Sequence, residues 1–303
     1  MVRRRRGAAA AAPGPVRETT AFRKAEKRYQ RRRSGAPTDF GDVVDCRPGA
    51  PNSAANAARL SVRASGATDV AGCPGLAVFP GALDAAAQRA LLAAAFSDYH
   101  RGTETNLGPA PGGAAPPPAG LRWATLGRHY DWSRRAYAAA RAAPVPADVS
   151  RRCAALAAAA GGGAFAAEAA IVNYYAPGDT MGGHVDDAEE DLARPLVSLS
   201  VGCAAVLLVG GETRDAPPTA LWLRSGDAVV FAGPARRAYH GVPRVLEGTC
   251  PPDLADAGRW GAGAGGDVAA LCAFAAAARV NVNVRQVDAP PPGASTWRTL
   301  TLT

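Results

Sequence analysis

The sequence predicts an α+β fold in which a double-sheet jelly roll (a double-stranded β-helix) is flanked by helices and preceded by a disordered basic arm. Three observations predict this fold. Helix-forming stretches occupy the front half of the chain, whereas six short strand-like runs follow residue 168. Glycine-containing turns separate several of those runs, as is typical of packed antiparallel sheets. Basic residues concentrate before residue 34.

One strand and two helices are predicted before the main series of strands. Residues 75–79 form an apolar run, and Asp84 is a suitable N-cap for a helix that continues to about residue 96. The Pro- and Gly-rich stretch 107–120 indicates a loop. A second helix is predicted over 147–160, because three consecutive glycines follow it and end it.

The later elements are short strands and one more helix. Strands are predicted at 169–175, 196–201, 204–209, 219–223, 227–232 and 279–287. An alanine-rich helix is predicted at 268–278. The Gly-, Pro- and Ala-rich insertion 248–267 comes before it, and we expect this insertion to be a surface loop.

Length and composition predict one globular domain with two extensions. With 303 residues, 48% of them hydrophobic, the chain can bury a sizeable core. We expect a largely irregular extension over 1–70, the domain over 71–288 and a tail over 289–303. No run approaches eighteen large apolar residues, so we expect no membrane partner. We also expect a monomer. Six cysteines without a C-x-x-C pair indicate free thiols in a reducing compartment.

The positive charge of the chain lies in its first 33 residues. They contain twelve Lys or Arg against two Glu, a net of +10, whereas the whole chain carries +8. Such an arm can hold a phosphate backbone without reading its sequence, which favours a nucleic-acid partner in the cytoplasm or nucleus. A mitochondrial transit peptide and a solvated tail are the two alternatives.

Two histidines and a carboxylate indicate a metal site. His184 and Asp186 are two residues apart in extended chain, so their side chains point to the same side. With His240 they give the two-His, one-carboxylate set typical of non-haem iron(II) oxygenases. Asp187 is a competing carboxylate that points away from His184 unless the strand contains a bulge.

The strand at 279–285 alternates strictly between two kinds of residue. Valines face one side, while Arg279, Asn281, Asn283 and Arg285 face the other. This pattern is that of an edge strand with a solvated polar face, or of a strand that lines a pocket for a small dicarboxylate.

These blocks resemble the AlkB-type 2-oxoglutarate- and iron(II)-dependent dioxygenases. Four blocks carry the resemblance, in the order and spacing of the family: 173–175, 184–186, His240 and 279–285. The stretches 121–132, 217–220, 225–227 and 278–287 look like the subfamily called AlkB homologue one. The resemblance covers residues 20 to 288.

The resemblance implies the cofactors and the roles of the residues. Iron(II) would be held by His184, Asp186 and His240, with 2-oxoglutarate and molecular oxygen as cosubstrates. The residues implied to bind 2-oxoglutarate are Asn173, Tyr175, Arg279, Asn281 and Arg285, of which Arg279 meets the distal carboxylate. The residues implied to face the substrate are Trp123, His129 and Tyr130. Core packing is the alternative for Trp123 and for the nearby Trp132.

The activity implied is oxidative demethylation or hydroxylation of methylated bases in nucleic acid. Transfer RNA carrying 1-methyladenine or 5-methylcytosine is the expected substrate, and N6-methyladenine in DNA is a further one. Two other functions stay open: a dioxygenase acting on a protein or small molecule, and a non-enzymatic RNA-binding protein with a vestigial site.

Overall fold

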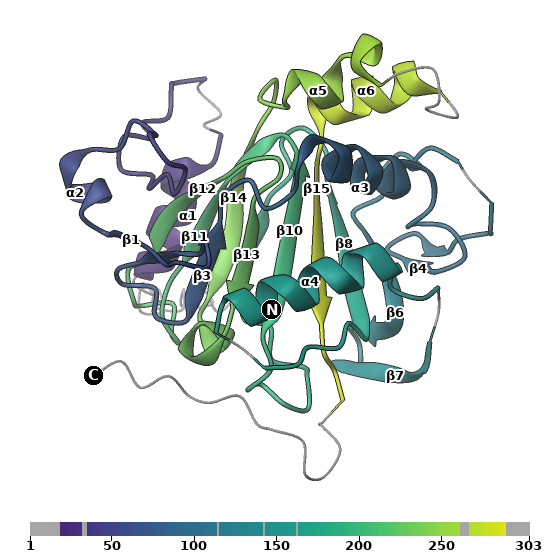
Figure 1. Cartoon of the computed structure of the whole chain (residues 1–303), viewed down its shortest axis with the longest axis horizontal. Helices are drawn as coiled ribbons and strands as arrows, with labels where there is room; N and C mark the ends of the chain where they lie inside the picture. Colours follow the sequence, from purple (N-terminus) through teal and green to yellow (C-terminus); the bar gives the residue numbers. More distant parts are fainter. Residues whose placement is uncertain are drawn as a thin grey trace, which may run out of the picture.

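Two antiparallel sheets form the centre of the molecule (Figure 1). This computed structural model describes residues 19–31, 35–113, 115–141, 143–161, 163–260 and 267–288. The larger sheet has, in spatial order, β1 (Leu60–Val62), β2 (Thr68–Val70), β3 (Leu76–Phe79), β13 (Ala228–Phe231), β10 (Leu196–Gly202), β15 (Arg279–Arg285), β8 (Ala169–Tyr175), β6 (Trp123–Asp131), β4 (Glu104–Thr105) and β5 (Gly108–Pro109), with β7 (Ala136–Arg141) paired to β6. The smaller sheet has β12 (Thr219–Leu223), β11 (Ala204–Val209), β14 (His240–Leu246) and β9 (Met181–His184).

Helices cover one face of the larger sheet. α3 (Ala85–Ser97) and α4 (Ala147–Ala159) lie across that face, while the short α5 (Pro252–Ala255) and α6 (Val268–Ala277) lie at one end of it (Figure 1). α1 (Ala21–Tyr29) lies against β9, β11 and β14, and α2 (Ala54–Ala57) precedes β1. Two short 3-10 helices, Gly233–Arg237 and Ala257–Arg259, complete the described elements.

Strand alternation divides the interior into two cores. On the helical face, the valines of β15 pack with α3 and α4; Val280, Val282 and Val284 are all fully buried there. On the opposite face, apolar residues of β3 and β13 meet those of β11, β12 and β14 between the sheets. Because Arg279 and Asn281 alternate with the valines, they point into the space between the two sheets.

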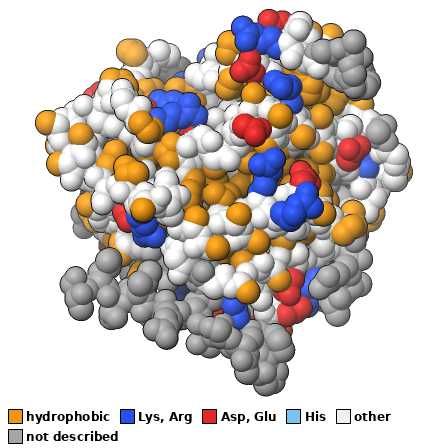
Figure 2. All heavy atoms as spheres, viewed as in Figure 1, with side chains coloured by type: hydrophobic (Ala, Val, Ile, Leu, Met, Phe, Trp, Pro, Cys, Tyr) orange, Lys and Arg blue, Asp and Glu red, His pale blue; other side chains and the backbone are white. Residues whose placement is uncertain are grey.

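The face that carries α3 and α4 has an evenly mixed charge. Figure 2 shows basic and acidic side chains scattered among apolar ones over this face, without one large patch of a single sign among the described residues. Every helix of the described chain is too short or too polar to cross a membrane. All six cysteines are free thiols, as the sequence predicts.

The jelly-roll fold and most of the predicted elements are confirmed. Asp84 caps α3, since its carboxylate accepts a hydrogen bond from the amide of Ala87 at 2.7 Å. The six later strands and the helices at 147–160 and 268–278 are present to within one or two residues. The front half contains more strand than the sequence predicts: β6 and β7 form a hairpin, and β5 lies inside the predicted loop 107–120.

The N-terminal extension is more ordered than predicted. Residues 19–31 were expected to belong to a disordered arm, yet they contain α1, which buries Phe22 and Tyr29 to 1% and 3% exposure. Residues 35–70 were expected to be irregular, yet β1 and β2 extend the larger sheet through β3. Burial of two aromatic rings against the smaller sheet explains the order of α1. The stretches 1–18, 32–34 and 289–303 lie outside the described residues.

Candidate metal centre and cosubstrate cavity

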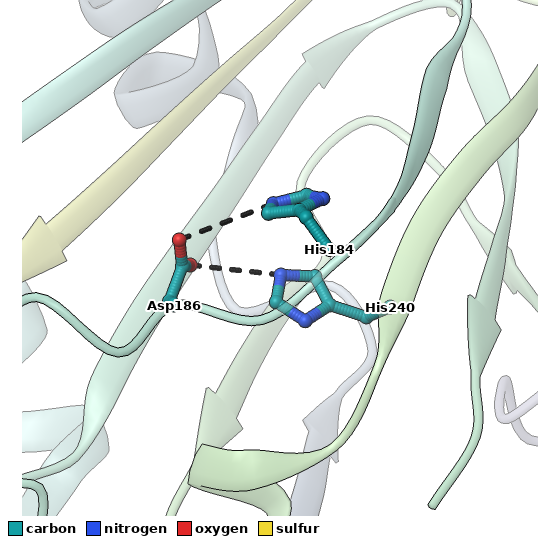
Figure 3. Close-up of side chains that lie close together, drawn as sticks. All are labelled: His184, Asp186 and His240. Atoms are coloured by element: carbon teal, nitrogen blue, oxygen red, sulfur yellow. Dashed lines mark ion pairs between the residues drawn. The ribbon is translucent and has the colours of Figure 1, made fainter. Parts of the chain in front are cut away.

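Three side chains converge at the edge of the smaller sheet (Figure 3). β9 and β14 pair so that His184 lies opposite His240, with their ring centroids 4.4 Å apart. Asp186 follows β9; its Oδ1 lies 3.9 Å from His184 Nε2 and its Oδ2 lies 3.5 Å from His240 Nε2. One ligand atom from each residue lies within 4.8 Å of the other two, a spacing that one metal ion can bridge.

Hydrogen bonds and charge favour the metal-binding forms of these residues. The Nδ1 atoms of His184 and His240 lie 3.0 and 3.1 Å from backbone carbonyls, so each Nδ1 carries the proton and each Nε2 is left as a ligand. Burial and the neighbouring His240 lower the pKa of His184. Burial by itself would raise the pKa of Asp186, but Arg285 and the two histidines outweigh it and hold that pKa well below the usual range. The ionised Asp186 carboxylate suits iron(II), and binding of the metal requires each imidazole in its neutral form.

Asp187 does not belong to the cluster. Its carboxylate forms an ion pair with Arg135 at 3.0 Å on the surface. Asp186, by contrast, has a buried Oδ2 without a hydrogen bond of good geometry, although Arg285 Nη2 is 2.8 Å away. The structure therefore places Asp186, and not Asp187, in the cluster, and both carboxylates lie just after the end of β9 at His184.

A small cavity of about 30 Å³ continues from the cluster into the space between the sheets. Arg279 lines it and is 1% exposed. Its Nη2 donates to Ser200 Oγ at 2.9 Å, whereas its Nε and Nη1 have no hydrogen-bond partner among the described residues. A buried guanidinium without an acidic partner is unfavourable, so this cavity has the chemistry of a carboxylate site.

The other predicted cosubstrate residues surround this cavity or its mouth. Tyr175 is opposite Arg279 in the β8–β15 pairing and lines the cavity with Asn281. Asn281 Nδ2 donates to Ser198 Oγ at 2.7 Å, which fixes its amide. Asn173 is opposite Asn281 in the same pairing, and lines the outer cleft described below.

Arg285 has surroundings different from those of Arg279. Its Nη2 lies 2.8 Å from Asp186, its Nε lies 3.2 Å from Glu189 and its Nη1 donates to the Tyr137 hydroxyl at 3.0 Å. Glu189 is buried and the Asp186 side chain is 13% exposed, and Glu189 also pairs with the buried Arg236 at 2.8 Å. Arg285 thus already has two acidic partners, and its ion pair with Asp186 helps to fix the position of that carboxylate.

The sequence did not indicate that Glu189, Arg236 and Tyr137 belong to this site. Arg236 Nη1 donates to the backbone carbonyl of Asp186 at 3.0 Å, and the Tyr137 hydroxyl donates to Glu189 Oε1 at 3.0 Å. Glu189 sits in an acidic run, 186–191, that resembles a solvated surface. Arg236 and Tyr137 are far from Glu189 in the sequence, and only the folded chain brings them into contact with it.

A cleft of about 390 Å³ lies in front of the three converging side chains. Trp123, Tyr130 and Trp132 line one side of it, with Trp123 and Trp132 centroids 3.9 Å apart and those of Tyr130 and Trp132 5.1 Å apart. Trp132 is 43% exposed, so core packing does not explain it. His129 does not line the cleft; its Nδ1 lies 3.1 Å from Thr125 Oγ1.

Comparisons with known proteins identify the family. The family model of the 2OG-Fe(II) oxygenase superfamily matches residues 75–285. The chain is 42% identical over 172 residues to the DNA N(6)-methyladenine demethylase ALKBH1A of Arabidopsis thaliana, covering 55% of this chain and 49% of that protein. It is 39% identical over 169 residues to the tRNA demethylase abh1 of Schizosaccharomyces pombe, covering 55% of this chain and 53% of that protein.

Two further matches extend over most of the compared protein. The alpha-ketoglutarate-dependent dioxygenase AlkB homolog of Caulobacter vibrioides is 35% identical over 180 residues, covering 58% of this chain and 80% of that protein. The solved structure of OsALKBH1 shares the fold, with a TM-score of 0.53 at 21% identity, over 70% of this chain and 97% of that chain. The chain spans about half the length of the plant and yeast relatives. It belongs to the 2OG-Fe(II) oxygenase superfamily and, within it, to the AlkB-type dioxygenases, which use iron(II) and 2-oxoglutarate.

Proposed function

We propose that the protein oxidises methyl groups on nucleic-acid bases, with transfer RNA carrying 1-methyladenine or 5-methylcytosine as its substrate. The observation that carries this proposal is the cleft of about 390 Å³, which joins an aromatic wall to His184 and Asp186 of the three-residue cluster. An enzyme that modifies a base must take it out of its stack, and aromatic side chains hold a flipped base by stacking.

The three converging side chains hold the iron in this proposal. His184 and His240 offer nitrogen ligands, Asp186 offers oxygen, and the remaining positions of the metal stay open. Bound iron(II) supplies the activation of oxygen. Arg285, Glu189 and the protein core around them orient Asp186 and keep bulk water from its rear.

Arg279 binds the distal carboxylate of 2-oxoglutarate in this proposal. The two unpartnered nitrogens of its buried guanidinium leave N–H donors free for a carboxylate oxygen. Tyr175 and Asn281 line the same cavity and complete the pocket, and Asn173 lies at its mouth. Arg285 is already paired with Asp186 and Glu189, so in this proposal it positions Asp186 beside the cosubstrate pocket.

The base enters between the aromatic residues and the metal. Tyr130 and Trp132 meet edge to face, and Trp123 packs on Trp132, which leaves planar surfaces toward the cleft. The names of the relatives support a nucleic-acid substrate, because one is a tRNA demethylase and another a DNA N(6)-methyladenine demethylase. The basic residues of 1–33 would add phosphate contacts, and we propose a cytoplasmic or nuclear monomer.

Reconstitution tests this proposal. The protein is loaded without oxygen with iron(II) and 2-oxoglutarate, mixed with bulk transfer RNA, and exposed to oxygen before nucleosides are measured by mass spectrometry. His184→Ala is the control. We expect loss of 1-methyladenine or appearance of oxidised 5-methylcytosine with the unaltered protein alone. Consumption of 2-oxoglutarate without any nucleoside change, in transfer RNA and in methylated DNA, would contradict the nucleic-acid substrate and favour a protein or small molecule.

A further inference from the structure

β9, the strand that ends at His184, has little support from its own sheet. It is the edge strand of the smaller sheet, and its pairing with β14 is limited to His184 with His240 and Met181 with Val242, with an irregularity between them. A short edge strand leaves backbone groups without a partner strand. Gly183 is such a position, directly before His184.

Two side chains from outside the sheet satisfy the backbone of Gly183. The Gly183 amide donates to Glu26 Oε1 at 2.6 Å, and the Gly183 carbonyl accepts from Arg214 Nη2 at 2.6 Å. Glu26 belongs to α1 and is 3% exposed, with its second oxygen paired to Arg23 at 2.9 Å. A buried carboxylate that accepts from one backbone amide replaces the strand that this edge lacks.

α1 is fixed against the same place by packing. Phe22 is 1% exposed, and its backbone amide donates to the carbonyl of Arg214 at 2.9 Å. A Cβ atom added at Gly183 would lie 2.5 Å from the Phe22 ring, and one at Gly210 would lie 3.1 Å from it. The ring therefore occupies the space that side chains on these strands would need, so α1 and β9 fit together only with glycine at 183.

Phe22 of α1 and Arg214 also contact the residue before the second histidine. Tyr239, which precedes His240, has its ring 6.3 Å from Phe22 and 5.2 Å from the Arg214 guanidinium. Its backbone carbonyl accepts from the Gly210 amide at 2.8 Å. α1 and Arg214 thus contact the residues that directly precede both histidines, Gly183 and Tyr239.

We propose that α1, through Glu26, is a positioning element for the metal centre, and that Glu26 sets the backbone from which His184 projects. This inference rests on the proposed metal role of His184. α1 precedes residues 75–285, the segment that the family model matches, so the N-terminal segment contributes to the site itself and is more than an arm for nucleic acid. Outer partners of metal ligands commonly change metal affinity by roughly 10- to 100-fold.

The test compares three variants of the full chain: Glu26→Ala, Glu26→Gln, and Lys27→Ala at an exposed position of the same helix. The first readout is hydrogen–deuterium exchange of the peptide containing Gly183 in metal-free protein. The second is cobalt(II) affinity by calorimetry. Glu26→Ala is expected to speed exchange at Gly183 and to weaken cobalt binding by about tenfold or more. Glu26→Gln keeps an oxygen acceptor, so it and Lys27→Ala are expected to stay within about twofold of the unaltered protein.

Unchanged exchange and cobalt affinity in a folded Glu26→Ala protein would overturn the proposal, as would equal losses in Glu26→Gln and Glu26→Ala. If Glu26→Ala does not fold, Arg214→Ala tests the premise that the Gly183 backbone positions His184, because it removes the donor to the Gly183 carbonyl from an exposed position. Weaker cobalt binding at an unchanged melting temperature is then expected, and unchanged binding overturns the proposal. A wild-type chain that binds no cobalt would contradict the proposed function, while the exchange data would still decide the role of Glu26.

Discussion

Replacing Arg279 by methionine should have opposite effects on the empty protein and on its affinity for 2-oxoglutarate. In the structure, the guanidinium is buried, has one hydrogen bond to Ser200 and leaves Nε and Nη1 without partners. Burial lowers the pKa of Arg279, which reflects the unfavourable surroundings of its charge. Methionine has a similar length and no charge, so it removes this unfavourable term but also removes the partner of the cosubstrate.

The size of both effects of Arg279→Met follows from the partners that the guanidinium has with and without bound 2-oxoglutarate. Loss of one partner from a buried, hydrogen-bonded charge pair costs about 3–5 kcal/mol, which corresponds to a roughly 10²- to 10⁴-fold higher Kd for 2-oxoglutarate. In the empty protein, removal of an unpaired buried charge should stabilise the fold by about 1–2 kcal/mol, after the lost hydrogen bond to Ser200 is subtracted. For a domain of this size, that is a rise of roughly 2–8 °C in Tm.

Thermal melting of the metal-loaded protein measures both effects. At about 100 times the Kd, 2-oxoglutarate should stabilise the unaltered protein by about 2.7 kcal/mol and leave Arg279→Met unaffected. A keto acid without the distal carboxylate should bind both proteins equally. Arg244→Met, on β14 and outside the cavity, is the matched control. If 2-oxoglutarate raises the Tm of Arg279→Met as much as that of the unaltered protein, the assignment of Arg279 is wrong.

Three further predictions concern the ligands, the cleft and the core. Asp186→Asn should abolish cobalt(II) binding measured by calorimetry, whereas Asp187→Asn should keep it, and the reverse result would exchange their roles. Tyr130→Ala should lower turnover of methylated oligonucleotide more than uncoupled 2-oxoglutarate consumption, and an equal loss of both would argue against base contact. Burial lowers the pKa of His100, so below a pH of about 6.5 the unfolded chain binds a proton that the folded chain does not. The free energy of unfolding should therefore fall as the pH drops from about 6.5, and His100→Leu should flatten that dependence in denaturant titrations; an unchanged slope would show that other groups cause it.

Local periodicity explains why β15 and the metal cluster could be predicted from the sequence. The valines of β15 alternate with polar residues, and alternation along a strand assigns each set to one face whatever the rest of the chain does. The same rule, applied to extended chain beyond His184, gave the expectation that Asp186 and not Asp187 joins the cluster, although β9 itself ends at His184. Both predictions concern residues close in the sequence, and extended chain fixes the relative directions of such side chains.

β6, β7 and α1 lacked such a local signal. β6 mixes buried and half-buried positions without alternation, because it pairs with β8 along one part and with β7 along the other. α1 carries many basic residues, and its burial depends on packing against β9, β11 and β14 and on the loop that contains Arg214, all far along the chain. Composition therefore indicated an arm, while tertiary packing made a helix.

Charge explains why the two arginines of β15 differ although the sequence treats them alike. Arg285 and Arg236 balance Asp186 and Glu189, so these four groups, of which only Asp186 is partly exposed, are together close to neutral. Arg279 adds a positive charge that no described acid compensates within hydrogen-bonding distance. A divalent cation bound by His184, Asp186 and His240 would raise this excess further, and a dianionic cosubstrate would offset it. Because charges interact strongly in a buried site, the metal and 2-oxoglutarate should each bind more tightly when the other is present, which is the physical reason why the unpaired guanidinium and the metal cluster form one site.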